Sequence, residues 1–302
     1  MSIWVCGEVL IDLIPGTDGV RVPHVGGGPA NTAKALARLG LDSYFIDGIS
    51  TDKYGVAARK ELLDDEVKLD LALMSDKPTC LATVTLDANG GASYEFLIDG
   101  TATFDFSLEW LPDPSRYKPN VLHIGTLVTV IEPGADVLYD WAIRVAEFAP
   151  IVYDPNIRPS VMGDRDKYQA SVEKWAAISS VIKVSDDDMA WLYPGVDYAD
   201  VAKRWVSDGA ALVVVTRGSQ GLIGFTADGA VEVPGVKIEV ADTVGAGDTV
   251  GAIIVEAMIE KGILNLTGEE LKSTLHRAAV AAGITCSRKG AQPPYKHELK
   301  GV

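Results

Sequence analysis

Short apolar runs alternate with longer helix-like stretches along the whole chain. Residues 3–6 and 211–216 are almost unbroken apolar runs, typical of strands buried on both faces of a sheet. Residues 29–39 predict a helix instead, with a proline in the first turn and Gly40 as its stop. Strands that alternate with helices predict a mainly parallel sheet covered by helices on both faces.

The same pattern extends to the other elements. We expect strands at 3–6, 44–49, 121–124, 151–153, 181–184 and 211–216, with a β-ribbon over 225–240. We expect helices at 29–39, 56–65, 135–148, 168–177, 186–192, 198–208, 247–261 and 268–286. Ligands on such sheets bind at the carboxyl ends of the strands.

Two segments depart from the alternation. Residues 9–25 are irregular and rich in Val, Ile, Pro and Gly, which fits a pair of strands that leaves the main body. Residues 79–98 predict a β-hairpin around a glycine-containing turn. Because no linker interrupts the pattern, we expect one domain over residues 1–302, with lid segments at about 9–25 and 79–104 inserted in it.

The composition indicates an acidic globular protein. Apolar residues make up 47% of the chain, and its formal net charge is -15. Binding to nucleic acid needs clustered Lys and Arg, which the sequence lacks, so we expect no such partner. We also expect no membrane span and no signal peptide. Three scattered cysteines (Cys6, Cys80 and Cys286) show no metal or disulfide spacing, which favours the reducing cytoplasm.

A run of small residues near the C-terminus carries the main chemical signal. Residues 242–249 read Asp-Thr-Val-Gly-Ala-Gly-Asp-Thr and lie between an expected strand at 236–240 and an apolar helix. Small residues leave backbone N–H groups open at a helix N-terminus, where the helix dipole favours anions. Asp248 would lie in the first turn, placed to accept a proton from an attacking hydroxyl. The structural alternative is a glycine-rich turn followed by a helix-stabilising acid.

A second run of small residues makes the pattern specific. Residues 242–249 resemble the C-terminal signature of the ribokinase-like (PfkB) carbohydrate kinases, and residues 26–33 (Gly-Gly-Gly-Pro-Ala-Asn-Thr-Ala) resemble their N-terminal sugar signature. The resemblance spans essentially the whole chain. It implies a three-layer α/β/α ribokinase-like fold with a small β-sheet lid. It also implies ATP-dependent sugar phosphorylation, with Asp248 as base and an anion hole formed by Gly245, Ala246 and Gly247.

The sugar site follows from the first signature and the lid. Glycines allow a polyol to approach the backbone, an amide offers both a donor and an acceptor, and a carboxylate can accept bonds from two hydroxyls. An Asp-Pro-Asn-Ile-Arg run at 154–158 resembles an element of fructokinases and ketodeoxygluconate kinases. Each of these residues also has a purely structural interpretation. Residues 154–158 could form an ordinary turn, Asn31 could be a polar residue in the first turn of a helix, and Asp12 could be a solvated loop carboxylate. The expected sugar-binding residues are Asp12, Gly27, Gly28, Asn31, Tyr94, Phe96 and Arg158.

The nucleotide and metal residues rest on the resemblance alone. It implies nucleotide contacts at Lys183, Ser185, Thr216, Gly218 and Gly221, with adenine against Ala279, Ala282 and Gly283. Asp188 would order Mg²⁺ through water. Asp242 with Thr243 would form a monovalent-cation site, which would make the enzyme K⁺-stimulated. Relatives commonly have Asn and Glu where this chain has Ser185 and Asp188, and a plain helix cap is an equal alternative there.

Fructose is the favoured substrate because the three motifs together look most like those of fructokinases. Ribose, ketodeoxygluconate and a nucleoside are the alternatives, and a sugar-binding regulator without catalysis is a rival of another class. A dinucleotide-dependent dehydrogenase is set aside because no glycine fingerprint follows the first strand directly. The expected partners are thus a sugar and ATP, and a homodimer stays open.

Overall fold

The computed structural model describes residues 1–16, 20–86 and 92–302, without the side chains of 84–86 and 92–94. A central sheet of eight strands runs in the order β14-β13-β12-β11-β10-β9-β1-β4 within these ranges. Strands β12 to β4 pair in parallel, whereas β13 and β14 pair antiparallel at one edge. The strands are β1 (Ile3–Cys6), β4 (Ser43–Ile46), β9 (Val121–Gly125), β10 (Ile151–Asp154), β11 (Val181–Ser185), β12 (Leu212–Thr216), β13 (Leu222–Thr226) and β14 (Gly229–Val233).

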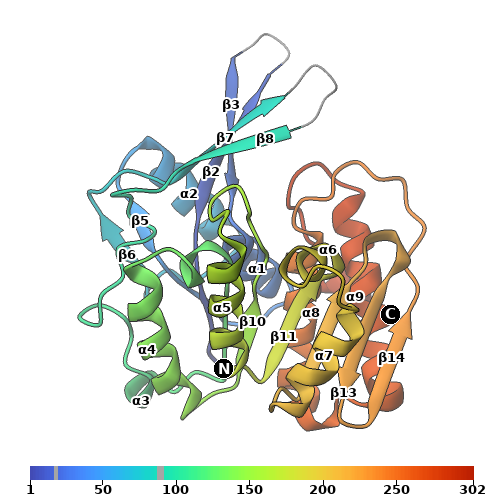
Figure 1. The fold of residues 1–302 in the computed structure, drawn as a ribbon. Helices are drawn as coiled ribbons and strands as arrows, with labels where there is room; N and C mark the ends of the chain where they lie inside the picture. Colours follow the sequence, from blue (N-terminus) through green and yellow to red (C-terminus); the bar gives the residue numbers. More distant parts are fainter. Residues whose placement is uncertain (17–19, 87–91) are drawn as a thin grey trace.

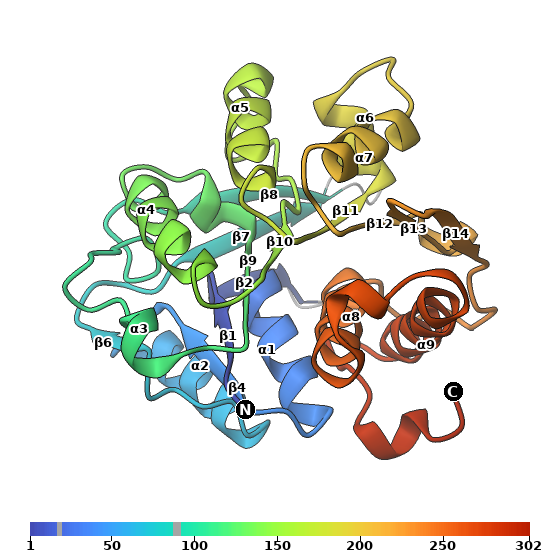
Figure 2. The same ribbon diagram turned by 90° about the horizontal axis from the view of Figure 1, so that it is seen from below.

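Helices cover both faces of this sheet (Figures 1 and 2). One apolar cluster joins the sheet to α1 (Gly28–Arg38), α2 (Lys53–Asp64), α8 (Ala246–Lys261) and α9 (Gly268–Cys286). A second cluster on the opposite face contains α4 (Gly134–Ala146), α5 (Arg165–Ala176), α6 (Asp186–Leu192) and α7 (Tyr198–Ser207). The short helix α3 (Pro114–Tyr117) contributes Tyr117 to an aromatic group with Trp4 and Trp141. The predicted three-layer α/β/α architecture is therefore confirmed.

The lid is a separate four-stranded sheet in the order β3-β2-β7-β8. Its strands are β2 (Leu10–Pro15), β3 (Arg21–Gly26), β7 (Leu81–Leu86) and β8 (Ala92–Leu97), and Figure 1 shows them projecting above the central sheet. β2 follows β1 after a short link, and β3 leads directly into α1. The two segments expected to leave the main body thus pair with each other, and they cover the edge where β1 ends.

Two predicted strands are corrected by the structure. Residues 236–240 form no strand, because the chain after Pro234 and Gly235 crosses helix α9 instead of joining a ladder. A methyl group built on Gly283 of α9 would lie 3.4 Å from Ile238 Cγ2, and Val240 is 60% exposed. Residues 44–49 divide at Asp47, whose carboxylate accepts the N–H groups of Val9 and Gly48. The part after the break, β5 (Gly48–Ser50), pairs with β6 (Leu73–Ser75) in a separate two-stranded sheet.

Short 3₁₀ helices complete the described elements. They are η1 (Thr126–Thr129), η2 (Gly218–Gln220), η3 (Ile263–Asn265) and η4 (Lys296–Leu299). In the described ranges, no helix is long and apolar enough to cross a membrane.

Candidate active site

A cavity of about 510 Å³ opens between the lid and the carboxyl ends of the parallel strands. It lies where open α/β sheets bind their ligands. Several chain segments meet in it: the link after β1, the start of α1, the ends of β10 and β11, and the start of α8. The predicted residues that line it are Asp12, Gly27, Gly28, Asn31, Phe96, Arg158, Lys183, Thr243, Gly245, Gly247 and Asp248.

Asp248 is buried at the wall of this cavity, in the first turn of α8. Its Oδ2 accepts a 2.9 Å hydrogen bond from the side-chain amide of Asn31. Its Oδ1 lies toward Gly28, where an added methyl group would come within 3.2 Å of it. Burial raises the pKa of Asp248, while Lys183, the Asn31 hydrogen bond and Arg158 oppose that rise. One carboxylate oxygen is therefore held by Asn31, and the other is available to a ligand beside Gly28.

The N-terminus of α8 is open to an anion. Gly245 precedes the helix in the left-handed conformation, with φ of 81°, and no side chain caps the first turn. A methyl group on Gly245 would lie 2.7 Å from the Cβ of Ala291, so a larger residue would displace that loop. Uncapped N–H groups and the helix dipole together favour negative charge at this point.

A buried ion pair lies beneath this helix start. Lys183 Nζ on β11 is 2.7 Å from Asp154 Oδ2 on β10, and the two side chains are 6% and 2% exposed. A methyl group on Gly247 would lie 3.0 Å from Lys183 Nζ, which places the ammonium group against the first turn of α8. The cavity therefore has a fixed positive charge next to the buried carboxyl group of Asp248.

Two further carboxyl groups, of Glu8 and Asp12, line the cavity. Burial raises the pKa of Asp12 to about 6, against the opposing charges of Arg158 and His24. Glu8, which is 3% exposed, accepts a hydrogen bond from the Thr126 hydroxyl. Burial raises the pKa of Glu8 to about 7, opposed first by that hydrogen bond. Glu8 was not among the expected site residues, and the structure places it in the cavity wall.

The loop after β10 brings Arg158 to the cavity. Asn156 has a positive φ of 40°, and its carbonyl and side-chain oxygens accept bonds from Arg158 Nη1 at 3.1 and 2.8 Å. The Asp-Pro-Asn-Ile-Arg run therefore forms a turn, which is what its structural interpretation predicted. The same turn holds the Arg158 guanidinium at the cavity. Apolar side chains complete the wall: Leu10, Ile14, Phe96 and Leu127. The side chain of Tyr94 lies outside the described residues.

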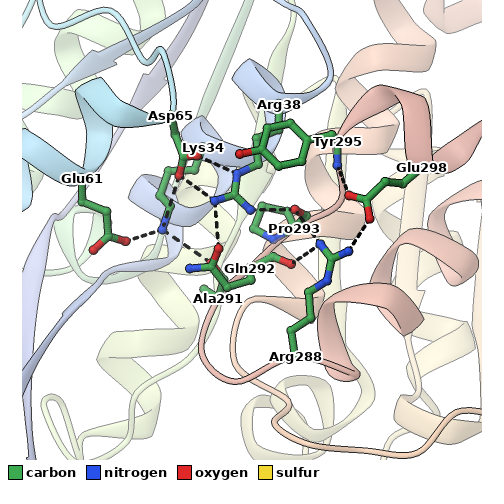
Figure 3. A network of polar contacts seen from close by, with 10 residues as sticks. All are labelled: Lys34, Arg38, Glu61, Asp65, Arg288, Ala291, Gln292, Pro293, Tyr295 and Glu298. Carbon is green, nitrogen blue, oxygen red and sulfur yellow. Dashed lines mark hydrogen bonds and ion pairs between the residues drawn. The ribbon is translucent and has the colours of Figure 1, made fainter.

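A polar network holds the back of the site together (Figure 3). Lys34 of α1, 2% exposed, contacts Glu61 and Asp65 and donates to the Ala291 carbonyl at 3.5 Å. Arg38, one turn further along α1, donates to Asp65 and to the Pro293 carbonyl at 2.8 Å. The helix that carries Asn31 is therefore tied to the loop that packs behind Gly245.

Comparison with known proteins decides the family. Residues 2–298 match the model described as pfkB family carbohydrate kinase. The chain belongs to this family. A fructokinase from Rhizobium leguminosarum bv. trifolii is 36% identical over 258 residues, which cover 84% of this chain and 78% of that protein. The family confirms the predicted kinase class.

Solved structures of fructokinases share the fold. A Xylella fastidiosa fructokinase with bound ATP has a TM-score of 0.91 at 24% identity, covering 99% of this chain and 97% of that one. A fructokinase double mutant from Vibrio cholerae O395, solved with fructose, ADP and potassium ion, has a TM-score of 0.87 at 23% identity. That match covers 99% of this chain and 96% of the other. The ribokinase-like fold inferred from the motifs is confirmed.

Within this kinase, the Ser185–Asp188 pair forms a helix cap. The Ser185 hydroxyl accepts from the N–H of Asp188 at 3.0 Å, and Asp188 Oδ2 accepts from the N–H of Ser185 at 3.4 Å. Asp188 Oδ1 accepts from the N–H of Ile157 at 3.0 Å, and burial raises the pKa of Asp188. The capping alternative is present in the structure, and a metal role for Asp188 stays a prediction. Within the described ranges, no group of three His, Cys, Asp or Glu side chains is arranged to hold a metal ion.

Of the predicted nucleotide residues, Lys183 lines the cavity, and the others lie outside its wall. Thr216 ends β12, and the turn η2 runs from Gly218 toward Gly221. Gly283 is covered by Val236 and Ile238, while Ala279 is 7% exposed in the core and Ala282 packs beside it. The adenine position expected there stays a prediction.

Asp242 connects two loops beside the start of α8. Its Oδ1 accepts from the N–H of Val244 at 3.1 Å, and its Oδ2 accepts from the N–H of Gly290 at 2.9 Å. The first of these loops carries Thr243 into the cavity wall, whereas Ala246 begins α8 just behind it. Asp242 thus fixes the approach to α8, and its role in binding a cation stays a prediction.

Proposed function

We propose that this kinase is a fructokinase, which transfers the γ-phosphoryl group of ATP to a hydroxyl of fructose. The observation that carries the proposal is the placement of Asp248. One oxygen of its buried carboxylate is held by Asn31, the other is directed at Gly28, and the uncapped start of α8 is adjacent. The relative from Rhizobium and the structural neighbours named above support fructose as the acceptor.

The chain supplies each part that phosphoryl transfer needs. Asp248 accepts the proton of the attacking hydroxyl at Oδ1, because Oδ2 is already occupied by Asn31. The N–H groups after Gly245 and the ammonium of Lys183 face the charge that develops on the transferred group. The lid over the cavity excludes water, which limits hydrolysis of ATP.

The sugar side combines polar and apolar groups in the way that a polyol requires. Asp12 and Glu8 offer carboxyl oxygens, and Arg158 offers a planar donor. Leu10 and Phe96 contact the carbon skeleton from the lid. A compact sugar with several adjacent hydroxyls fits this distribution better than an apolar acceptor.

Metal ions enter this scheme with ATP. Magnesium when bound neutralises charge on the β- and γ-phosphoryl oxygens. Asp188 and Asp242 fit outer positions in such a site, because each of their carboxylate oxygens already accepts a backbone N–H and keeps lone pairs for water. We propose Asp188 for water-mediated contact with Mg²⁺, and Asp242 with Thr243 for the loop that would bind K⁺.

A substrate panel tests the proposal. ADP release is measured with fructose, ribose, ketodeoxygluconate and nucleosides, each with and without K⁺. We expect fructose to give the highest kcat/KM, by at least about tenfold, because hydroxyl contacts made in the transition state discriminate strongly. Faster turnover of another acceptor would replace fructose, and sugar binding without ADP release would favour a regulator.

A further inference from the structure

Asp154 has no role in the scheme so far, although it begins the Asp-Pro-Asn-Ile-Arg run. It is the last residue of β10, and Lys183 lies on the neighbouring strand β11. The 2.7 Å contact between Asp154 Oδ2 and Lys183 Nζ joins two side chains that are almost fully buried. Only Lys183 of this pair lines the cavity, so Asp154 supports it from behind.

The pair is costly as a purely structural feature. Taking two charges out of water costs several kcal/mol per ion, and well-packed apolar side chains often replace such pairs without loss of stability. Asp154 Oδ1 is also buried without a hydrogen-bond partner among the described residues. An unsatisfied buried oxygen costs about 1–3 kcal/mol. Stability therefore gives little reason for an aspartate here.

The surroundings of Lys183 explain the buried Asp154–Lys183 ion pair better than stability does. Charged groups face its ammonium from three elements: Asp154 on β10, Asp248 on α8 and Asp188 on α6. His123 on β9 is also nearby, and burial lowers its pKa to about 3, so it is neutral. The ammonium thus lies between the supporting carboxylate and the base, against the first turn of α8.

We propose that Asp154 is a positioning residue, which holds the Lys183 ammonium at the start of α8 so that one cation serves both the base and the transferred phosphoryl group. This inference rests on the proposed kinase mechanism. Asp154 touches neither sugar nor nucleotide in this scheme and acts only through Lys183. Asparagine at position 154 would keep the shape of the side chain but lose the charge that fixes the cation.

The pH profile separates this role from a structural one. Burial alone lowers the pKa of Lys183, but Asp154 and Asp248 raise it above its usual value. Without the Asp154 charge, less opposes the effect of burial, so the pKa of Lys183 falls and its ammonium group loses its proton at lower pH. The Lys183 charge also lowers the pKa of Asp248, so losing it raises that pKa. In Asp154→Asn, the alkaline limb of kcat should therefore move to lower pH, and wherever Lys183 is neutral the base also becomes harder to ionise.

The experiment is a double-mutant cycle on the full chain, using ATP and fructose. Asp154→Asn and Lys183→Met should each lower kcat by about 100-fold, as loss of one group that stabilises transition-state charge does. The double variant should match Lys183→Met, because Asp154 acts through that lysine. The fructose KM should stay within about threefold throughout. Asp136→Asn is the matched control, since it removes an exposed carboxylate 2.8 Å from Lys174 and should leave kcat unchanged.

The outcomes are distinct. Normal kcat and an unshifted alkaline limb in folded Asp154→Asn would overturn the inference, and so would independent, multiplicative losses in the double variant. If Asp154→Asn fails to fold, the double variant, which buries neither charge, is compared with Lys183→Met; unequal kcat values would again overturn it. Wild-type protein that fails to phosphorylate fructose would refute the substrate proposal instead, and the cycle would then run on the sugar that it does phosphorylate.

Discussion

The side-chain amide of Asn31 holds the carboxylate of Asp248, the proposed base. It was predicted to bind sugar, and in the structure it donates to Asp248 across 217 residues of sequence. That contact orients the carboxylate and favours its ionised form. Motif spacing identified both residues but not the bond between them, because the bond depends on how α1 and α8 pack.

Glu8 gives a residue-scale prediction for stability. Its pKa rises from 4.5 in the unfolded chain to about 7 in the folded protein, so the folded state holds the extra proton between these values. Stability from this group is complete below pH 4.5 and is lost as the pH rises through 7. The free energy of unfolding of Glu8→Gln, compared with that of wild type, should therefore be more favourable at pH 8 than at pH 5, by up to about 3 kcal/mol.

Urea unfolding at the two pH values measures this difference. An exposed acid, Glu109→Gln, serves as the control and should show the same stability difference from wild type at both. An equal effect of Glu8→Gln at pH 5 and pH 8 would mean that Glu8 is ionised at both, and would refute its raised pKa.

At the scale of elements, the cap of α6 separates helix stability from metal binding. Ser185→Ala removes one capping acceptor and should cost about 1 kcal/mol of unfolding free energy. Asp188→Ala frees two backbone N–H groups and should cost more. If Asp188 also orders metal-bound water, only Asp188→Ala should raise the Mg²⁺ concentration for half-maximal activity, by about tenfold. An unchanged Mg²⁺ titration in Asp188→Ala would assign this residue to capping alone.

The elements themselves were largely predictable because their hydrophobic patterns are local. The exceptions show what local pattern omits. Residues 236–240 alternate like a strand, yet they lie on α9 because Pro234 and Gly235 turn the chain away from the sheet edge. The break at Asp47 arises from its bonds to two backbone N–H groups, one of them on Val9.

At the scale of the whole molecule, the site is assembled from segments that only the topology brings together. The signatures at 26–33 and 242–249 meet because α1 and α8 cover the same face of the sheet. The Lys183–Asp154 pair exists because β10 and β11 are neighbours in register. The sequence could therefore identify Asp248 and the lid, but not Glu8, the partner of Lys183 or the network in Figure 3.

The central claim is that Asp248 is the base. The most direct measurement is the turnover of Asp248→Asn with ATP and fructose, beside calorimetric measurement of fructose binding. We expect kcat to fall by at least about 100-fold, because a positioned general base contributes about 10²–10⁴-fold. Fructose affinity should stay within about threefold, since asparagine keeps the shape of the side chain. Near-normal turnover with a folded variant would contradict the account.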